Sequence, residues 1–260
     1  MTAQAESRSP AWCEERWQEM SAAHVASPTP DYAALLRAWQ QVGEQCAGTG
    51  VYEARLASIL MIQKQPAAAQ KVLASINEPP APEYAALIEG TRLQVDREIS
   101  LQGKAPGTVD ISRFAPRVEQ LVASAPDWYV AHEQASTFWL WSGEPGKAIA
   151  EGKRAVELEP KSWWGYRTMA IAYSELGEYR TAAVMGDRAH ANHKAVSADA
   201  DLMLALARSY AAMGNIKMSE TVLGLLFKYR PEVRDSQQYR DALVFIRDVT
   251  QGAGGNQQQR

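Results

Sequence analysis

The stretch Trp163-Trp-Gly-Tyr-Arg-Thr-Met-Ala-Ile-Ala-Tyr-Ser-Glu-Leu-Gly177 decides the fold. Apolar residues recur within it at the i, i+3, i+4 and i+7 spacing of one helix face, as Met169, Ala172, Tyr173 and Leu176. Gly177 can then end the helix in a left-handed conformation that other residues adopt at a cost. The stretch therefore predicts an amphipathic helix followed by a sharp turn.

The same pattern recurs along the chain at a spacing of 34 residues. Four pairs of positions keep this spacing: Trp139 and Tyr173, Gly143 and Gly177, Ala148 and Ala182, and Ala155 and Ala189. A third unit begins near Ala200 and reaches its glycine at Gly214, which is 37 residues after Gly177. Three extra residues therefore lie before this unit, near Ala195–Ala198.

This arrangement resembles the tetratricopeptide repeat (TPR) family, in which a 34-residue unit carries a large residue, a small one, an aromatic, a turn glycine, two alanines and a closing proline. The resemblance covers residues 129–233. It implies helix pairs that stack into an all-α solenoid, because one pair cannot bury its own apolar face. We expect about five antiparallel helix pairs, an N-terminal helical hairpin and a C-terminal capping helix.

These patterns divide the chain into five predicted segments: a hairpin in 1–48, divergent TPR-like pairs in 49–128, three TPR repeats in 129–233, a capping helix in 234–249 and a disordered tail in 250–260. Within 49–128, Lys64-Gln65-Pro66 replaces the turn glycine, and a helix is expected from about Val109 to Ala125 despite Pro116.

The two cysteines lie at helix ends. Ser9-Pro10 and Thr29-Pro30-Asp31 are strong helix starts, which place Cys13 in a first turn and Cys46 in the last turn of the next helix. Antiparallel packing brings these turns together, so we expect a disulfide; two ordinary buried thiols are the alternative. A disulfide indicates an oxidising compartment, and we expect a bacterial periplasm, with the cytoplasm as the alternative.

Composition excludes several classes. The net charge is −3, without the basic excess that nucleic-acid binding requires, and no apolar run could span a bilayer. Met1–Pro10 lacks the pattern of a signal peptide, so in the periplasm Met1 would stand where a signal peptide has been removed. We expect no nucleic-acid partner, no membrane span, and a monomer or weak dimer.

Catalytic and metal motifs are missing from the sequence. There is no Gly-x-Ser-x-Gly, phosphate-binding loop or His-Glu-x-x-His, so we expect neither an enzyme nor a cofactor. Asp187, His190 and His193 have metal-ligand spacing but no identifiable fourth ligand, and they fall where a second helix ends in a solvated loop, which favours exposed polar residues. His132 occupies a position that TPR proteins give to a packing residue.

Five tryptophans concentrate around one junction between repeats: Trp128, Trp139, Trp141, Trp163 and Trp164. Three are explained by packing, with Trp139 as the repeat aromatic and Trp163 filling the interface. The resemblance places Trp141 and Trp164 on first helices, at positions that face the concave groove. Aromatic side chains on such a surface are typical of peptide binding.

The TPR pattern directs positions 2, 5, 9, 12 and 13 of each first helix into the groove. The expected partner-binding residues are Glu133, Trp141, Trp164, Arg167, Ser174 and Arg208. The arginines could bind a partner carboxylate in bidentate fashion. Alternatively, Glu133, Glu175 and Asp201 pair with them. Carrying over the lysine/asparagine/arginine clamp of some TPR proteins gives no match.

The sequence thus favours a non-catalytic scaffold or adaptor that binds a protein or peptide in the groove, in bacterial envelope assembly or secretion. Three alternatives stay open: a sugar-polymer-binding module or enzyme accessory subunit that uses the aromatics, a structural subunit of an envelope complex, and a cytoplasmic TPR adaptor. The convex face or the N-terminal hairpin could also be the contact surface.

Overall fold

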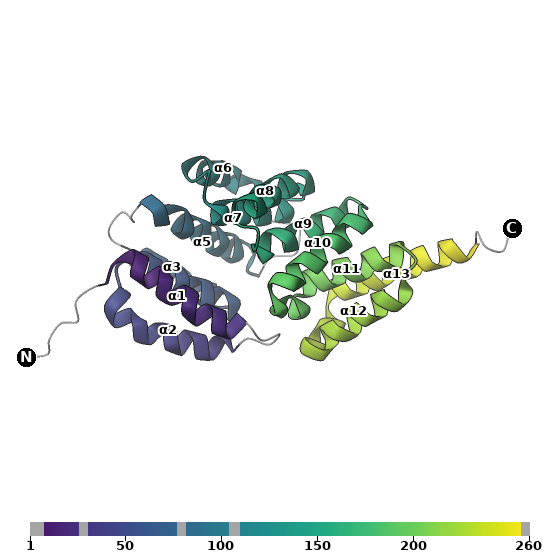
Figure 1. The fold of residues 1–260 in the computed structure, drawn as a ribbon, viewed down its shortest axis with the longest axis horizontal. Coiled ribbons are helices and arrows are strands. Elements are labelled where there is room, and N and C mark those ends of the chain that lie inside the picture. The colour runs from purple at the N-terminus through teal and green to yellow at the C-terminus, as the bar shows by residue number, and fades with distance from the viewer. Residues whose placement is uncertain (1–7, 26–30, 77–81, 104–109, 256–260) are drawn as a thin grey trace, which may run out of the picture. The chain divides into compact units, whose positions relative to one another are not determined.

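The computed structural model describes residues 8–25, 31–76, 82–103 and 110–255. Across these ranges the regular elements are helices, and no strand occurs, so the all-α prediction is confirmed (Figure 1). The elements are α1 (Pro10–Val25), α2 (Tyr32–Cys46), α3 (Val51–Ile62), α4 (Pro66–Ala74), α5 (Pro82–Leu101), η1 (Ser112–Phe114), α6 (Ala115–Ser124), α7 (Tyr129–Trp141), α8 (Pro145–Leu158), α9 (Trp163–Glu175), α10 (Tyr179–Asn192), η2 (Lys194–Ala198), α11 (Ala200–Ala212), α12 (Ile216–Tyr229), η3 (Pro231–Asp235) and α13 (Gln237–Gly255).

The chain forms two compact units, and the division between them falls inside α7, between Ala135 and Ser136. The first unit contains α1 to α6 and the start of α7. The second contains the rest of α7 and the helices through α13. The predicted boundary between 128 and 129 lies close to this division but does not coincide with it.

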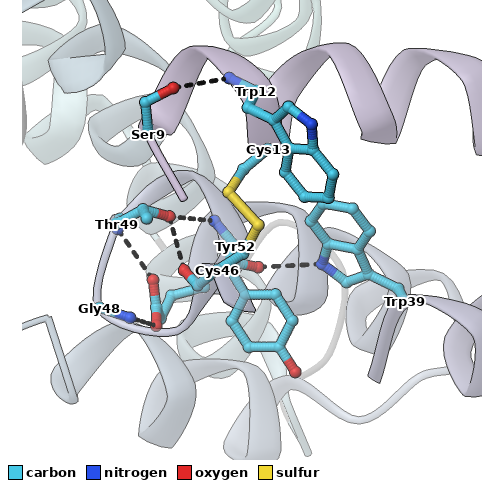
Figure 2. The surroundings of a disulfide bond; sticks show 10 residues. Ser9, Trp12, Cys13, Trp39, Cys46, Gly48, Thr49 and Tyr52 are labelled. Atoms are coloured by element: carbon cyan, nitrogen blue, oxygen red, sulfur yellow. Dashed lines mark hydrogen bonds between the residues drawn. A yellow bond between two sulfur atoms is a disulfide. The ribbon is translucent and has the colours of Figure 1, made fainter. Parts of the chain in front are cut away.

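In the first unit, the N-terminal hairpin is held by a disulfide between Cys13 of α1 and Cys46 of α2 (Figure 2). Both cysteines are fully buried in the core of this unit. In the same hairpin, the indole N–H of Trp39 donates to the Tyr52 carbonyl oxygen at 3.1 Å (Figure 2). The predicted pairing of the two helix ends is therefore present.

A second link joins α1 to α3. The Arg55 guanidinium donates to both carboxylate oxygens of Glu14, with an Nε–Oε2 distance of 3.0 Å. The same guanidinium lies 5.5 Å from the ring centre of Trp17. At the start of α3, the buried Glu53 carboxylate accepts the backbone N–H groups of Gly48 and Gly50. These contacts hold α1 against α3 and fix the α2–α3 turn. In each of them a charged side chain that is removed from solvent has hydrogen-bond partners.

In the second unit, the helix pairs of the three predicted repeats are α7–α8, α9–α10 and α11–α12. The turn glycines Gly143, Gly177 and Gly214 have φ values of 73°, 78° and 76°, which confirms their predicted left-handed role. In the first unit, Lys64 takes this role with a φ of 60°, at the position where the sequence lacks a glycine.

Close approach between α8 and α9 depends on two further glycines. A Cβ built on Gly152 would lie 2.7 Å from Cγ of Met169 and 3.3 Å from the carbonyl oxygen of Gly165. A Cβ on Gly165 would in turn lie 3.3 Å from the Gly152 carbonyl oxygen. The backbones of α8 and α9, which belong to neighbouring repeats, are therefore in contact here. A larger residue at either glycine would force the two helices apart.

Two predicted helix limits need correction. The helix expected from Val109 begins as α6 at Ala115, because proline is tolerated in a first turn but not in a helix interior, and Pro116 occupies that first turn. The capping helix α13 continues beyond Val249 to Gly255, through residues assigned to a disordered tail on composition. Residues 256–260 of that predicted tail lie outside the described residues.

The disulfide gives a stability prediction. Protein purified from an oxidising compartment should have an intact mass two protons below the reduced form, and reductant should lower its melting temperature. The expected loss is about 3–4 kcal/mol of unfolding free energy, because the bond closes a long loop in the unfolded chain. A double variant, Cys13→Ser with Cys46→Ser, should melt at the lower temperature with or without reductant. Free thiols in the oxidised preparation would contradict the prediction.

The glycine contact gives a second prediction. Gly152→Ala should destabilise the protein by about 1–3 kcal/mol, because Met169 is buried and the Gly165 backbone cannot retreat. Gly224 in α12 is the matched control, since a Cβ there meets nothing within 4 Å. Gly224→Ala should stabilise by about 0.5–1 kcal/mol through helix propensity. Chemical denaturation measures the change in unfolding free energy for both variants. If both variants were stabilised, or both destabilised, the result would be inconsistent with this packing.

Candidate functional site: the first-helix face of the second unit

The first-helix face is the surface that α9, α11 and the part of α7 after Ala135 form at the predicted groove positions. Trp164 of α9 lies half-buried on it, and its indole N–H donates to the Thr137 hydroxyl of α7 at 2.6 Å. The Arg167 guanidinium lies 4.8 Å from the centre of the same ring. The indole is thus held at its N–H edge by Thr137 and over its face by Arg167, and Trp164 keeps part of its surface accessible.

Arg167 is buried, with 6% of its surface exposed, and it pairs with two carboxylates. Its Nε donates to Asp199 at 2.6 Å, and its terminal nitrogen donates to Asp199 at 3.0 Å and to Asp201 at 3.1 Å. Burial disfavours the charge, but the two carboxylates outweigh it, so the pKa of Arg167 is raised. The Arg167 guanidinium is therefore paired within the second unit, as the ion-pair alternative expected for Asp201, and its contact with a partner stays a prediction.

Asp199 is a partner that the sequence pattern did not point to. It lies before α11 and caps that helix, accepting the backbone N–H of Leu202 at 3.0 Å. The Asp-x-x-Leu spacing at a helix start was a usable signal for the cap. It gave no indication of the ion pair, which requires the positions of both helices.

Ser174, another residue predicted to bind a partner, lies inside the second unit. It is 1% exposed, and its hydroxyl donates to the Ala205 carbonyl oxygen at 3.1 Å and accepts from the Ser209 hydroxyl at 3.0 Å. In the structure Ser174 therefore joins α9 to α11.

Arg208 of α11 is half-buried, and its guanidinium lies 4.9 Å from the ring centre of Phe245 in α13. The ring centre of Phe245 also lies 6.0 Å from that of Tyr179, and the Gln238 amide of α13 donates to the Asp201 carboxylate at 3.2 Å. Helix α13 thus packs along α11 at one end of the first-helix face. The sequence predicted a capping helix without indicating that it would contact Arg208.

Two other predicted residues lie on α7. Trp141 is half-buried in the second unit, on the first-helix face. Glu133 is half-buried but belongs to the first unit, because the division follows Ala135. Trp141, Trp164 and Arg208 all belong to the second unit, and each retains accessible surface.

Packing roles predicted for neighbouring residues are present. Trp139 is buried, with the Lys147 ammonium 4.2 Å from its ring centre. Trp163 stacks on the His193 ring at 4.3 Å between centres, so the prediction that His193 is exposed was wrong: the residue is buried against this indole. His132 is buried, and its Nε2 lies 2.9 Å from the Pro126 carbonyl oxygen, which makes it the satisfied packing histidine that the sequence suggested.

Clustered metal-ligating side chains were the other possibility in the part of the chain that the structure describes. No group of three or more His, Cys, Asp or Glu side chains there is arranged to hold an ion. Among the same residues, no helix has both the length and the apolar character needed to cross a membrane.

Solved structures establish the fold. No protein-family model and no curated protein matches the sequence. TTC0263, a thermophilic TPR protein of Thermus thermophilus, aligns with a TM-score of 0.53 at 20% identity, over 75% of this chain and 99% of that one. The chain has the tetratricopeptide-repeat fold. A chain of the APC/C hetero-tetramer Cut9–Hcn1 aligns with a TM-score of 0.59 at 12% identity; the match covers 83% of this TPR chain and spans only 39% of that chain's length.

The His193 stack predicts a dependence of stability on pH. Burial lowers the pKa of His193 below its ordinary value of 6.5, and burial, with Lys194, also lowers the pKa of His190. The unfolded chain therefore binds more protons near these pKa values, so stability present above about 6.5 is lost as the pH falls through the folded-state pKa. The melting temperature should drop between pH 7 and pH 5.

The matched variant for this prediction is His193→Phe, which keeps a flat ring against Trp163 and cannot titrate. Its melting temperature should fall less steeply over the same pH range. The remaining pH dependence comes from His190, whose pKa is also lowered. Identical pH profiles for the two proteins would show that the His193 stack does not carry the effect.

Proposed function

We propose that the protein is a non-catalytic scaffold that binds a partner protein or peptide on its first-helix face. The observation that carries this proposal is the placement of Trp164. Its ring is partly accessible, yet it is fixed by Thr137 and Arg167, which are themselves buried. A pre-positioned aromatic ring loses little conformational freedom on binding, which favours affinity.

The partner chemistry follows from the accessible residues. Trp141 and Trp164 offer apolar area to a partner side chain. Arg208 remains half-buried beside Phe245, and the structure gives its buried Nε no hydrogen-bond partner. An apolar residue flanked by a carboxylate would suit this combination, because arginine recognises carboxylates in bidentate geometry. Glu133, on the same helix as Trp141, remains a proposed contributor.

The fold supports a scaffold role by analogy. Cut9 occurs in a hetero-tetramer with Hcn1, so a chain of this fold takes part in a protein assembly. Fold alone does not determine activity, and the proposal therefore depends on the residues of the first-helix face rather than on the likeness.

For the compartment, we propose the bacterial periplasm and a role in envelope assembly or secretion. The buried Cys13–Cys46 bond supports an oxidising environment, where such bonds persist. The cytoplasm is the alternative, and the thiol measurement on protein from its native source distinguishes the two.

The binding test starts from a peptide library selected on the wild-type protein, with affinities then measured by calorimetry. Trp164→Ala and Arg208→Ala should each weaken binding by about 10–100-fold, the range of interface hot spots, without loss of helicity. Val184→Ala is the control, because Val184 is an exposed apolar residue of α10 that lies outside the first-helix face. This control should keep the wild-type affinity at a temperature where it is folded.

Equal affinities across these variants would exclude the first-helix face and leave the convex face or the N-terminal hairpin as the contact surface. Selection of no peptide, together with retention on an immobilised polysaccharide that Trp164→Ala abolishes, would instead support the sugar-polymer-binding alternative.

A further inference from the structure

The outward surface of α13 carries charged residues at equal distances on either side of Val244, with opposite signs at matching positions. Arg240 and Asp241 precede this residue by four and three positions, and Arg247 and Asp248 follow it by three and four. Residues at these spacings share one helix face. All four charged residues are exposed, and Val244 and the adjacent Leu243 are 47% and 41% exposed.

The opposite side of α13 is engaged within the second unit. Ala242 is buried, Phe245 contacts Tyr179 and Arg208, and Tyr239 packs edge-on against Phe227 at 5.0 Å. These contacts hold the helix with its charged face outward. The face is therefore a fixed surface of the second unit rather than part of the contact with α11.

We propose that this face pairs with the same face of a second copy of the chain, with the two α13 helices antiparallel and Val244 on the two-fold axis. In this arrangement, Arg240 lies opposite Asp248 of the second copy, and Asp241 lies opposite Arg247. Two-fold symmetry repeats both pairs, so four ion pairs surround a centre formed by Val244 and Leu243. A self-complementary patch is what a two-fold dimer requires.

The charge order selects the antiparallel arrangement. Parallel helices in register would place each arginine opposite the same arginine and each aspartate opposite the same aspartate, which is repulsive. With Val244 aligned to Val244, the charges of the two helices attract each other only when the helices are antiparallel.

The present partners of these side chains leave them free to exchange. Arg247 lies 3.2 Å from its neighbour Asp248, and Gln237 donates to Asp241 at 2.7 Å. Arg240 donates to the Gln237 side chain at 2.9 Å and to the Asp235 carbonyl oxygen at 2.9 Å, and all of these residues are exposed. Exposed pairs of this kind are weak and readily replaced. Because the apolar centre is small and the ion pairs are exposed, the dimer is weak and sensitive to salt.

Sedimentation velocity at low salt, over a range of protein concentrations, tests the proposal. The wild-type chain should shift from its monomer mass of 28.6 kDa toward twice that mass, and added salt should reverse the shift. Arg240→Asp and Asp248→Arg should each raise the dimer dissociation constant about tenfold or more, since each places like charges opposite each other twice.

Two experiments that restore the opposite charges are decisive. The double variant Arg240→Asp with Asp248→Arg restores opposite charges across the axis and should dimerise like the wild type. These residues are eight positions apart, too far for direct compensation within one helix. An equimolar mixture of the two single variants should form a heterodimer, because each chain then supplies the charges that the other needs.

Glu220→Arg, an exposed reversal on α12, is the surface control and should dimerise as the wild type does. A wild-type chain that stays monomeric throughout, a dimer that ignores the single reversals, or failure of both rescues in folded variants would each overturn the proposal. None of these outcomes bears on peptide binding at the first-helix face, so the two proposals can fail separately.

Discussion

Burial of α9 is the constraint on which the second unit depends. Every residue of this helix from Gly165 to Ser174 is buried. Such a helix needs very close neighbours, and the sequence provides them through Gly152 and Gly165, where α8 approaches to backbone contact. It also needs internal partners for its polar side chains, because burying an unpaired polar group is costly. Arg167 and Ser174 find those partners on the approach to α11 and on α11 itself.

These internal partners explain how a helix of the scaffold can also serve binding. The Arg167 ion pair and the Ser174–Ser209 contact fix α9 against α11, and Thr137 fixes the N–H edge of the Trp164 indole. The charged and polar residues that the repeat pattern directs toward the groove therefore hold the surface in place. The residues that remain accessible, Trp141, Trp164 and Arg208, are those through which we propose that a partner binds.

Much of the fold could be predicted from the sequence, because its determinants are local. A turn glycine needs a left-handed conformation wherever it lies, and the 34-residue spacing of Trp139 and Tyr173 follows from one helix pair repeating. The Cys13–Cys46 bond was predictable for the same reason, since both residues lie at recognisable helix ends. Lys64 shows where a local rule fails, as a residue other than glycine adopts the left-handed turn.

The candidate site was only partly predictable, because its side chains are paired across different helices. The repeat pattern gives the direction of a Cβ atom but not the groups that its side chain meets. Asp199 belongs to the irregular stretch before α11, so no repeat position announced it as the partner of Arg167. The extent of α13 was missed for another reason: its end is rich in glycine, and composition was a poor guide to a helix that packing already holds at Ala242 and Phe245.

Amide hydrogen exchange along the second unit tests the central role of α9 most directly. If the unit is arranged around this helix, the amides of residues 165–174 exchange most slowly and open only with global unfolding. The amides of α13, which packs through one side alone, exchange faster. Exchange in α9 as fast as in α13 would contradict the account, because a helix that opens readily could not hold Trp164 in a fixed position.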